Sequence, residues 1–187
     1  MLLSGPEISL KEVANQASSI FVEKPFGLPR YNWTNGRHIQ DGESYQLAIL
    51  NNIIVHKRFA LYSLETKSHI SNMTYTGHLD RSYPKSYERI DDELKLNVDT
   101  PVELDEESLV FILGGQNNIY HWYFNWFPRL FVFKKLADKV GVKLSGVKVL
   151  VSESLPPNMR DMILKEGVDP ENIISIRANT CAVIIKR

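Results

Sequence analysis

SLVFILGGQNNIYHWYFNWFPRL occupies residues 108–130 and joins a short apolar run to an aromatic-rich segment through two glycines. The apolar and β-branched residues from Ser108 to Leu113 are typical of a buried strand. The segment Ile119–Val140 has the length and the apolar spacing of a helix. We therefore expect a strand, a glycine turn and a helix, in that order, as the start of a βαβ unit.

The following residues continue this alternation. Strands are predicted at Val147–Val151 and Ile173–Ile176, with a helix at Pro157–Glu166 between them. A glycine follows each predicted helix, where a left-handed C-terminal cap belongs. The expected fold class is α/β, with an N-terminal β-meander followed by a βαβαβ, Rossmann-like half of a doubly wound sheet.

The first hundred residues show a different pattern. They open with a turn-rich lead-in, in which a short helix is predicted at Ser9–Ser19. Three runs rich in β-branched and aromatic residues lie between Tyr45 and Leu64, and they predict a small antiparallel meander. Residues 73–100 are polar and lack a sustained periodicity, so we interpret them as a long connection. The predicted units are a lead-in, a meander with its connection, and an α/β segment: residues 1–44, 45–100 and 101–187.

The composition argues against several classes of protein. The chain has 187 residues, and its 22 lysines and arginines balance its 22 acidic residues, so a nucleic-acid partner is not expected. The single cysteine, Cys181, rules out an intramolecular disulfide and a thiolate zinc site, and it fits a reducing, cytoplasmic compartment. No apolar run approaches the roughly 20 residues that a membrane span requires, so a membrane span is not expected.

The glycine turn is the first candidate ligand site. Gly114 and Gly115 end the predicted strand, and Asn117 and Asn118 precede the helix. Such a turn lets a phosphate or a sugar hydroxyl approach backbone N–H groups at the positive end of a helix. The structural alternative is a tight turn in which Asn117 or Asn118 caps the helix, and the pattern by itself favours this alternative.

A polar stripe on the predicted helix is the second candidate. At 3.6 residues per turn, one face carries five side chains: Asn118, His121, Trp122, Asn125 and Arg129. Aromatic and aliphatic flanks predict that the helix packs against the sheet and leaves this seam in an apolar setting. A hydroxyl-rich substrate suits the seam, with Trp122 offering an apolar face to a sugar ring and Arg129 pairing with an anionic group. The alternative is a structural network with neighbouring loops.

Pro128 lies inside the same predicted helix. Proline lacks a backbone N–H, and its ring crowds the carbonyl one turn before it. We therefore expect an irregularity in the helix, with a freed carbonyl, in the turn that precedes Pro128.

The segment resembles the signature of family 61 glycosyltransferases, in which Asn-x-x-His-Trp is followed by an acidic residue and then by Pro-Arg-Leu. The corresponding residues here are Asn118, His121, Trp122, Pro128, Arg129 and Leu130. Asn125 stands where the family usually has Glu or Asp, so a carboxylate general base at that position would be missing. The similarity in the order of elements extends over residues 45–187.

The resemblance implies a GT-B-like enzyme of two Rossmann-type halves, with acceptor contacts on the first and the nucleotide-sugar on the second. This chain would supply the acceptor side without the C-terminal donor half, and we expect little transfer activity from it alone. The implied reaction moves a sugar from a nucleotide-sugar to a glycan or polysaccharide acceptor, as in capsular polysaccharide assembly. It needs no cofactor and no metal, and the sequence contains no Asp-x-Asp pair of the kind that holds a divalent cation on a diphosphate.

These considerations give a set of candidate residues. His121 is the candidate catalytic residue, since it can bind the acceptor or assist proton removal. The candidate substrate-binding residues are Gly114, Gly115, Asn117, Asn118, Trp122, Asn125 and Arg129. The alternative is a non-catalytic glycan- or protein-binding module with the same fold, and self-association as a homo-oligomer stays open.

Overall fold

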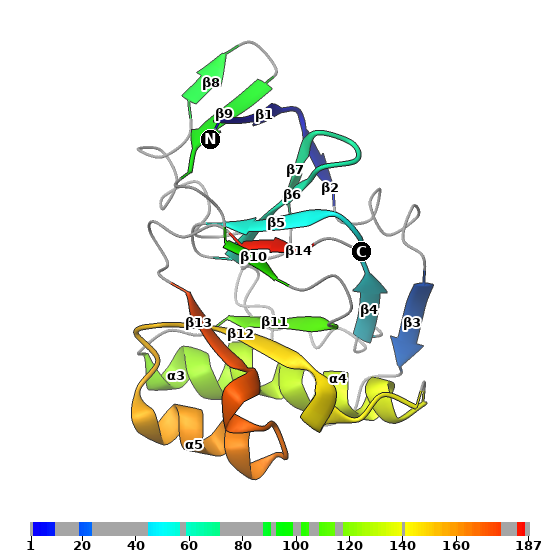
Figure 1. Cartoon of the computed structure of the whole chain (residues 1–187), viewed down its shortest axis with the longest axis vertical. Helices are drawn as coiled ribbons and strands as arrows, with labels where there is room; N and C mark the ends of the chain where they lie inside the picture. Colours follow the sequence, from blue (N-terminus) through cyan, green and yellow to red (C-terminus); the bar gives the residue numbers. More distant parts are fainter. Residues whose placement is uncertain are drawn as a thin grey trace, which may run out of the picture.

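The computed structural model describes most of the α/β segment and separate parts of the N-terminal half. The described residues are 2–9, 19–23, 45–56, 59–71, 88–90, 93–98, 102–104, 109–114, 118–139, 141–176 and 183–185. They form a mixed α/β structure of small sheets stacked in layers, with the helices on one outer side (Figure 1). The expected α/β class is present in this general form.

The strands and helices expected after residue 108 are present. Strands β11 (Val110–Gly114), β12 (Lys148–Ser152) and β13 (Ile173–Ile176) form a parallel sheet in this order. Helix α5 (Pro157–Lys165) connects β12 to β13. Between β11 and β12 the chain is helical in three consecutive pieces: α3 (Ile119–His121), a π-helical turn (Trp122–Trp126) and α4 (Phe127–Lys139).

A larger sheet of six strands covers the other face of this parallel sheet (Figure 1). Its centre is an antiparallel meander of β5 (Ile53–His56), β6 (Ala60–Ser63) and β7 (Ser68–Ser71). The meander was expected to begin at Tyr45, but β4 (Tyr45–Ile49) pairs instead with β3 (Ser19–Glu23) in a separate two-stranded sheet. The predicted helix at Ser9–Ser19 falls mainly on residues outside the described ranges.

The six-stranded sheet also contains strands from both ends of the predicted α/β segment. Strand β14 (Val183–Ile185) pairs antiparallel with β5 and parallel with β10 (Val102–Leu104). At the opposite edge, β2 (Glu7–Ser9) pairs with β7. A boundary at residue 101 therefore does not separate two independent sheets, because residues 101–187 contribute two strands to the sheet of the meander.

A third layer comes from residues that were interpreted as a connection. Strands β8 (Glu88–Ile90) and β9 (Glu93–Asn97) form a hairpin, and β9 also pairs with β1 (Leu2–Gly5). Each strand is too short to show a clear alternation, since only Leu96 of β9 is buried. The interpretation of residues 73–100 as purely irregular is therefore wrong for this hairpin.

Strand β5 holds the layers together, because its side chains point alternately to the two faces of the sheet and all four residues are buried. Ile53 and Val55 face the parallel sheet and pack with Leu150 and Ile176. Ile54 faces the opposite way and packs against Leu96 and Val98, beside β9. Because successive side chains of a strand point to opposite faces, a strand buried throughout must be covered on both sides.

Within the described ranges, the helices are too short or too polar to cross a membrane.

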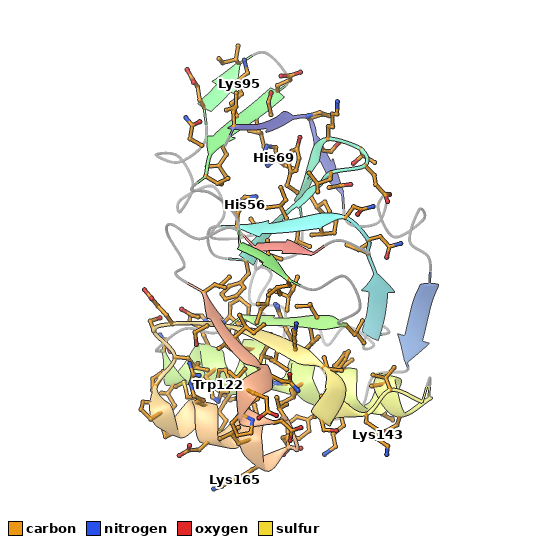
Figure 2. All side chains as sticks on the ribbon, viewed as in Figure 1. His56, His69, Lys95, Trp122, Lys143 and Lys165 are labelled. Atoms are coloured by element: carbon orange, nitrogen blue, oxygen red, sulfur yellow. The ribbon has the colours of Figure 1, made fainter. Side chains whose placement is uncertain are left out.

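Aromatic and imidazole groups occupy the layer between the six-stranded sheet and the β1–β9–β8 sheet. The hydroxyl of Tyr62 donates to the Ser4 carbonyl at 2.8 Å, and Nε2 of His69 lies 3.1 Å from the Leu94 carbonyl. The rings of Tyr62 and His69 meet edge to face at 4.9 Å, and those of His69 and His56 at 6.0 Å (Figure 2). These contacts fasten both β1 and β9 to the meander.

Burial, with a smaller contribution from the nearby Glu93 carboxylate, raises the pKa of Tyr62 above 10.0. The native protein therefore holds the phenol proton more tightly than the unfolded chain does. The corresponding stabilisation is complete below about pH 10 and is lost as the pH rises through the higher native pKa. The folded state is thus expected to weaken in alkali at this residue.

We predict that Tyr62→Phe lowers the free energy of unfolding at neutral pH by roughly 1 kcal/mol, because one hydrogen bond is lost. The same variant should lose less stability than the wild type between about pH 9 and pH 11.5, because one titrating group is gone. Urea unfolding across this range measures both effects. Tyr120→Phe, at an exposed tyrosine, is the matched control and should follow the wild type. Parallel curves for wild type and Tyr62→Phe would contradict the prediction.

Candidate functional site

The helix that carries the candidate residues begins with a side-chain cap. Asn118 has an extended backbone, and its Oδ1 accepts hydrogen bonds from the N–H groups of Tyr120 at 3.0 Å and His121 at 3.3 Å. This is the role of an N-cap residue, which satisfies N–H groups that have no partner inside the helix. The structural alternative for the glycine turn, in which an asparagine caps the helix, is therefore the arrangement observed at Asn118. Gly115 and Asn117 lie outside the described residues.

The helix widens directly before Pro128. The N–H of Phe127 bonds to the carbonyl of Trp122, five residues earlier, which defines a π turn. Pro128 has no N–H for the Phe124 carbonyl, and in a regular α-helix its ring would crowd that carbonyl. One additional residue in the turn relieves this conflict. The irregularity expected before Pro128 is thus present, in the form of a π turn.

The π turn changes which side chains share a face. An inserted residue rotates everything after it by about 100° relative to a continuous α-helix. The π turn therefore rotates only Arg129 relative to the start of the stripe. The predicted stripe is also wrong as one face before the turn, because Trp122 is fully buried while Asn118 is exposed and His121 is partly exposed. The backbone of Asn125 lies in the π turn, and its side chain is outside the part of the structure that is described.

Trp122 belongs to the core and not to a ligand-binding surface. Its ring stacks on Phe127 at 5.4 Å, and its Nε1 donates to Sδ of Met162, 3.4 Å away on α5 (Figure 2). The expectation that Trp122 presents an apolar face to a sugar ring is corrected by this burial. An indole gains more from burial between two helices than almost any other side chain, because it removes a large apolar area from water.

Gly114 makes room for a tryptophan. The register between β11 and β12 shifts just before Gly114, which has a φ of +81°. A Cβ at this position would lie 2.4 Å from the ring of Trp126. Gly114 was expected to let a ligand approach the backbone closely. In the structure, the Trp126 ring occupies this space at Gly114 instead.

Arg129 also contacts the Trp126 ring. Its guanidinium carbon is 4.4 Å from the centre of the Trp126 ring, in cation–π geometry. The ring of Phe59, directly before β6 of the meander, packs on Trp126 at 6.4 Å. Arg129 was expected to pair with an anionic group of a substrate, and in this structure its charge is directed to an aromatic ring.

The exposed surface at the start of the helix is aromatic. Tyr120 is 56% exposed, Tyr123 48% and Phe124 66%, and His121 lies partly exposed among them. The rings of Tyr120 and Phe124 lie 4.8 Å apart, and the Tyr120 ring meets His121 edge to face at 5.7 Å. The sequence pattern placed Tyr120 and Phe124 on the packed flanks of the helix. The π turn before Pro128 is a signal that could have revealed the exposure of Phe124, which lies in that turn, but not that of Tyr120, which precedes it.

Hydroxyl groups from the next strand lie at the same edge of the parallel sheet. Gly114 aligns with Val151, and β12 ends one residue later at Ser152. Oγ of Ser152 is 2.8 Å from Oγ of the exposed Ser154. Ligands of open α/β sheets bind beyond the carboxyl ends of parallel strands, and the helix start belongs to this edge. Among the described residues, no three side chains of the metal-ligating types cluster together.

Chemically, this region offers neutral groups. Residues 118–127 include no Asp, Glu, Lys or Arg, and the polar groups of this stretch include an imidazole, two carboxamides and two phenols. An imidazole can accept a proton from a hydroxyl, and carboxamides and phenols can orient one.

Comparisons of the chain with models of protein families, with curated proteins and with solved structures found no match. The function is therefore argued from the residues of the site and from the signature they resemble.

Gly114→Ala is predicted to lower the free energy of unfolding by about 2–4 kcal/mol, since the methyl group collides with Trp126 and the residue keeps a left-handed backbone. Gly141→Ala is the matched control, because Gly141 has a φ of +74° and nothing within 4 Å of the added methyl. This control should cost about 1 kcal/mol. Urea unfolding measures both.

A double-mutant cycle isolates the ring contact. Trp126→Leu should cost less in the Gly114→Ala background than in the wild type, because in that background the loss of the indole also removes its collision with the added methyl group. Equal losses for the two alanine variants, together with additive effects in the cycle, would show that the Trp126 ring does not restrict Gly114.

Proposed function

We propose that this chain is the acceptor-side part of a glycosyltransferase with a GT-B-like architecture of Rossmann-like halves. In this proposal a sugar passes from a nucleotide-sugar to a glycan or polysaccharide acceptor without a metal ion. The match to the family 61 signature supports the proposal, as does the parallel β11–β12–β13 sheet with its intervening helices. A chain with one cysteine suits the cytoplasm, where nucleotide-sugars are used in polysaccharide assembly.

The observation that carries the proposal is the position of His121. It lies in the first helical turn after a glycine-ended parallel strand, partly exposed, between the N-cap residue Asn118 and the aromatic rings. This is the edge of an α/β sheet where ligands bind. The imidazole is the strongest candidate for proton transfer in the uncharged stretch 118–127.

The chemistry of transfer assigns a simple role to this imidazole. The acceptor hydroxyl forms a bond to the anomeric carbon of the donor sugar, while the bond from that carbon to the nucleotide phosphate breaks. The hydroxyl proton moves to a ring nitrogen of neutral His121, and the nucleotide leaves with the electron pair of the broken bond. Since Asn125 replaces the carboxylate usual in the signature, His121 is the base that the described residues offer.

A non-catalytic glycan- or protein-binding module is the second candidate, and a specific observation favours it. Trp122 and Trp126 are buried, Arg129 lies over Trp126, and Asn118 caps the helix, so much of the signature serves packing. Such a module would retain a ligand at the exposed rings and carry out no transfer. The two candidates differ in whether His121 affects a rate or only binding.

His121→Ala, tested together with the donor-binding half that the proposal requires, is predicted to reduce sugar transfer by about 10²–10⁴-fold, the usual contribution of a general base. The thermal midpoint should stay close to that of the wild type, since His121 is partly exposed. Incorporation of labelled sugar from a panel of nucleotide-sugars measures the rate. Lys143→Ala, at an exposed residue of the loop after α4, is the control.

Unchanged transfer by His121→Ala would reject the catalytic role of this residue. Absence of transfer by the wild type with every nucleotide-sugar tested, together with retained glycan binding, would reject the enzyme and favour the binding module.

A further inference from the structure

Three aromatic side chains at the start of the helix are exposed although burial would stabilise them. Phe124 exposes 66% of its surface, Tyr120 56% and Tyr123 48%. Burying a side chain as large as phenylalanine contributes roughly 1.5–3 kcal/mol, so such exposure is a cost that most folds avoid. Neighbouring exposed rings of this kind mark a surface that contacts something else.

The exposed rings of Tyr120 and Phe124 adjoin each other, and Tyr123 is exposed directly before Phe124 in the chain. Tyr120 and Phe124 are four residues apart and face the same way, with ring centres 4.8 Å apart and planes inclined by 37°. His121 lies at the edge of this surface, 5.7 Å from the Tyr120 ring centre. We call Tyr120, Tyr123 and Phe124 the aromatic platform.

The packing beneath the platform fixes its position. Trp122 and Trp126, the first and last residues of the π turn, are buried and hold the helix against α5 and β11. The backbone that carries the platform is therefore fixed by the two buried tryptophans. Binding of a ligand does not have to order this segment first. Preorganised aromatic surfaces bind with a smaller entropic cost than mobile ones.

The chemistry of the platform selects its occupant. Residues 118–127 contain no charged side chain, which disfavours an anionic lipid surface, since amphipathic helices that bind such surfaces carry lysine or arginine on their polar face. A pyranose ring has C–H faces of slightly positive charge that fit the negative face of an aromatic ring. Its rim of hydroxyls can bond to the phenols of Tyr120 and Tyr123 and to the imidazole of His121.

We propose that the aromatic platform binds one sugar ring of a neutral glycan acceptor by stacking, with the acceptor hydroxyl directed toward His121. This inference rests on the proposed function, which supplies the class of ligand. It adds which residues hold the acceptor and that the bound sugar carries no charge. Stacking on Tyr120 and Phe124 positions the glycan, and His121 acts on the hydroxyl at the rim.

The first test is binding of neutral hexasaccharides of glucose, xylose and mannose by isothermal titration to the 187-residue chain. Phe124→Ala and Tyr120→Ala should each weaken binding of the best hexasaccharide about tenfold, the loss of one stacking contact. Phe124→Trp should keep or improve the affinity, because it retains a ring. Ile119→Ala is the matched control, since Ile119 is 56% exposed on the same turn but has no ring, and it should bind like the wild type.

A second measurement separates the sugar from a second copy of the chain. Sedimentation of the wild type should show the same mass as Phe124→Ala. A larger mass that falls in Phe124→Ala would identify the platform as a dimer interface and would overturn the proposal, as would stronger binding of a polyglucuronate oligosaccharide than of every neutral one.

The platform and the proposed function fail in different ways. If platform variants lose glycan binding while the complete native protein transfers no sugar, the platform stands and the enzyme is rejected. If transfer occurs, and the platform variants bind and transfer with wild-type constants, the platform is rejected and the enzyme stands. Absence of hexasaccharide binding by the wild type also overturns the platform.

Discussion

The contact between Gly114 and the ring of Trp126 fixes how the helix sits on the parallel sheet. No side chain larger than hydrogen fits at this position, because a Cβ would lie 2.4 Å from the indole. Trp126 reaches this place from the π turn, which Pro128 favours by removing an N–H from the helix ladder. The burial of Trp126 on β11, and of Trp122 against α5, then leaves the intervening aromatic residues on the outside.

One short motif therefore has a buried side and an exposed side. The tryptophans and Arg129 serve packing, since the guanidinium lies over Trp126 and the Trp122 indole bonds to Met162. The face with His121 and Phe124 is open to solvent. A signature of this kind can be kept for packing at some positions and for chemistry at others, so each residue has to be placed individually before it is given a role.

Local signals made the α/β part predictable. Strands β11, β12 and β13 have apolar runs of the right length, and Pro157 begins α5 as its position suggested. The return of β14 to β5 depends on long-range pairing of short strands. The hairpin of β8 with β9 is local, but its strands of three and five residues are too short to carry a periodic signal. At the candidate site, the position of Asn118 before the helix predicted its role as a cap. Trp122 was misplaced because helical spacing does not reveal which elements pack on a face, and α5 covers the indole with Met162.

The helix is also tied to the meander, although the two belong to different layers. Phe59 packs on Trp126 at 6.4 Å and has a φ of +65°, a conformation that is costly for a bulky residue. Such a backbone persists only where the surroundings compensate for it, and here the phenyl ring is buried in the core between the two sheets. Since β14 also crosses from the α/β segment to β5, the parallel sheet and the meander constrain the same helix from two directions. The site at the start of that helix therefore depends on the meander as much as on the strand that precedes it.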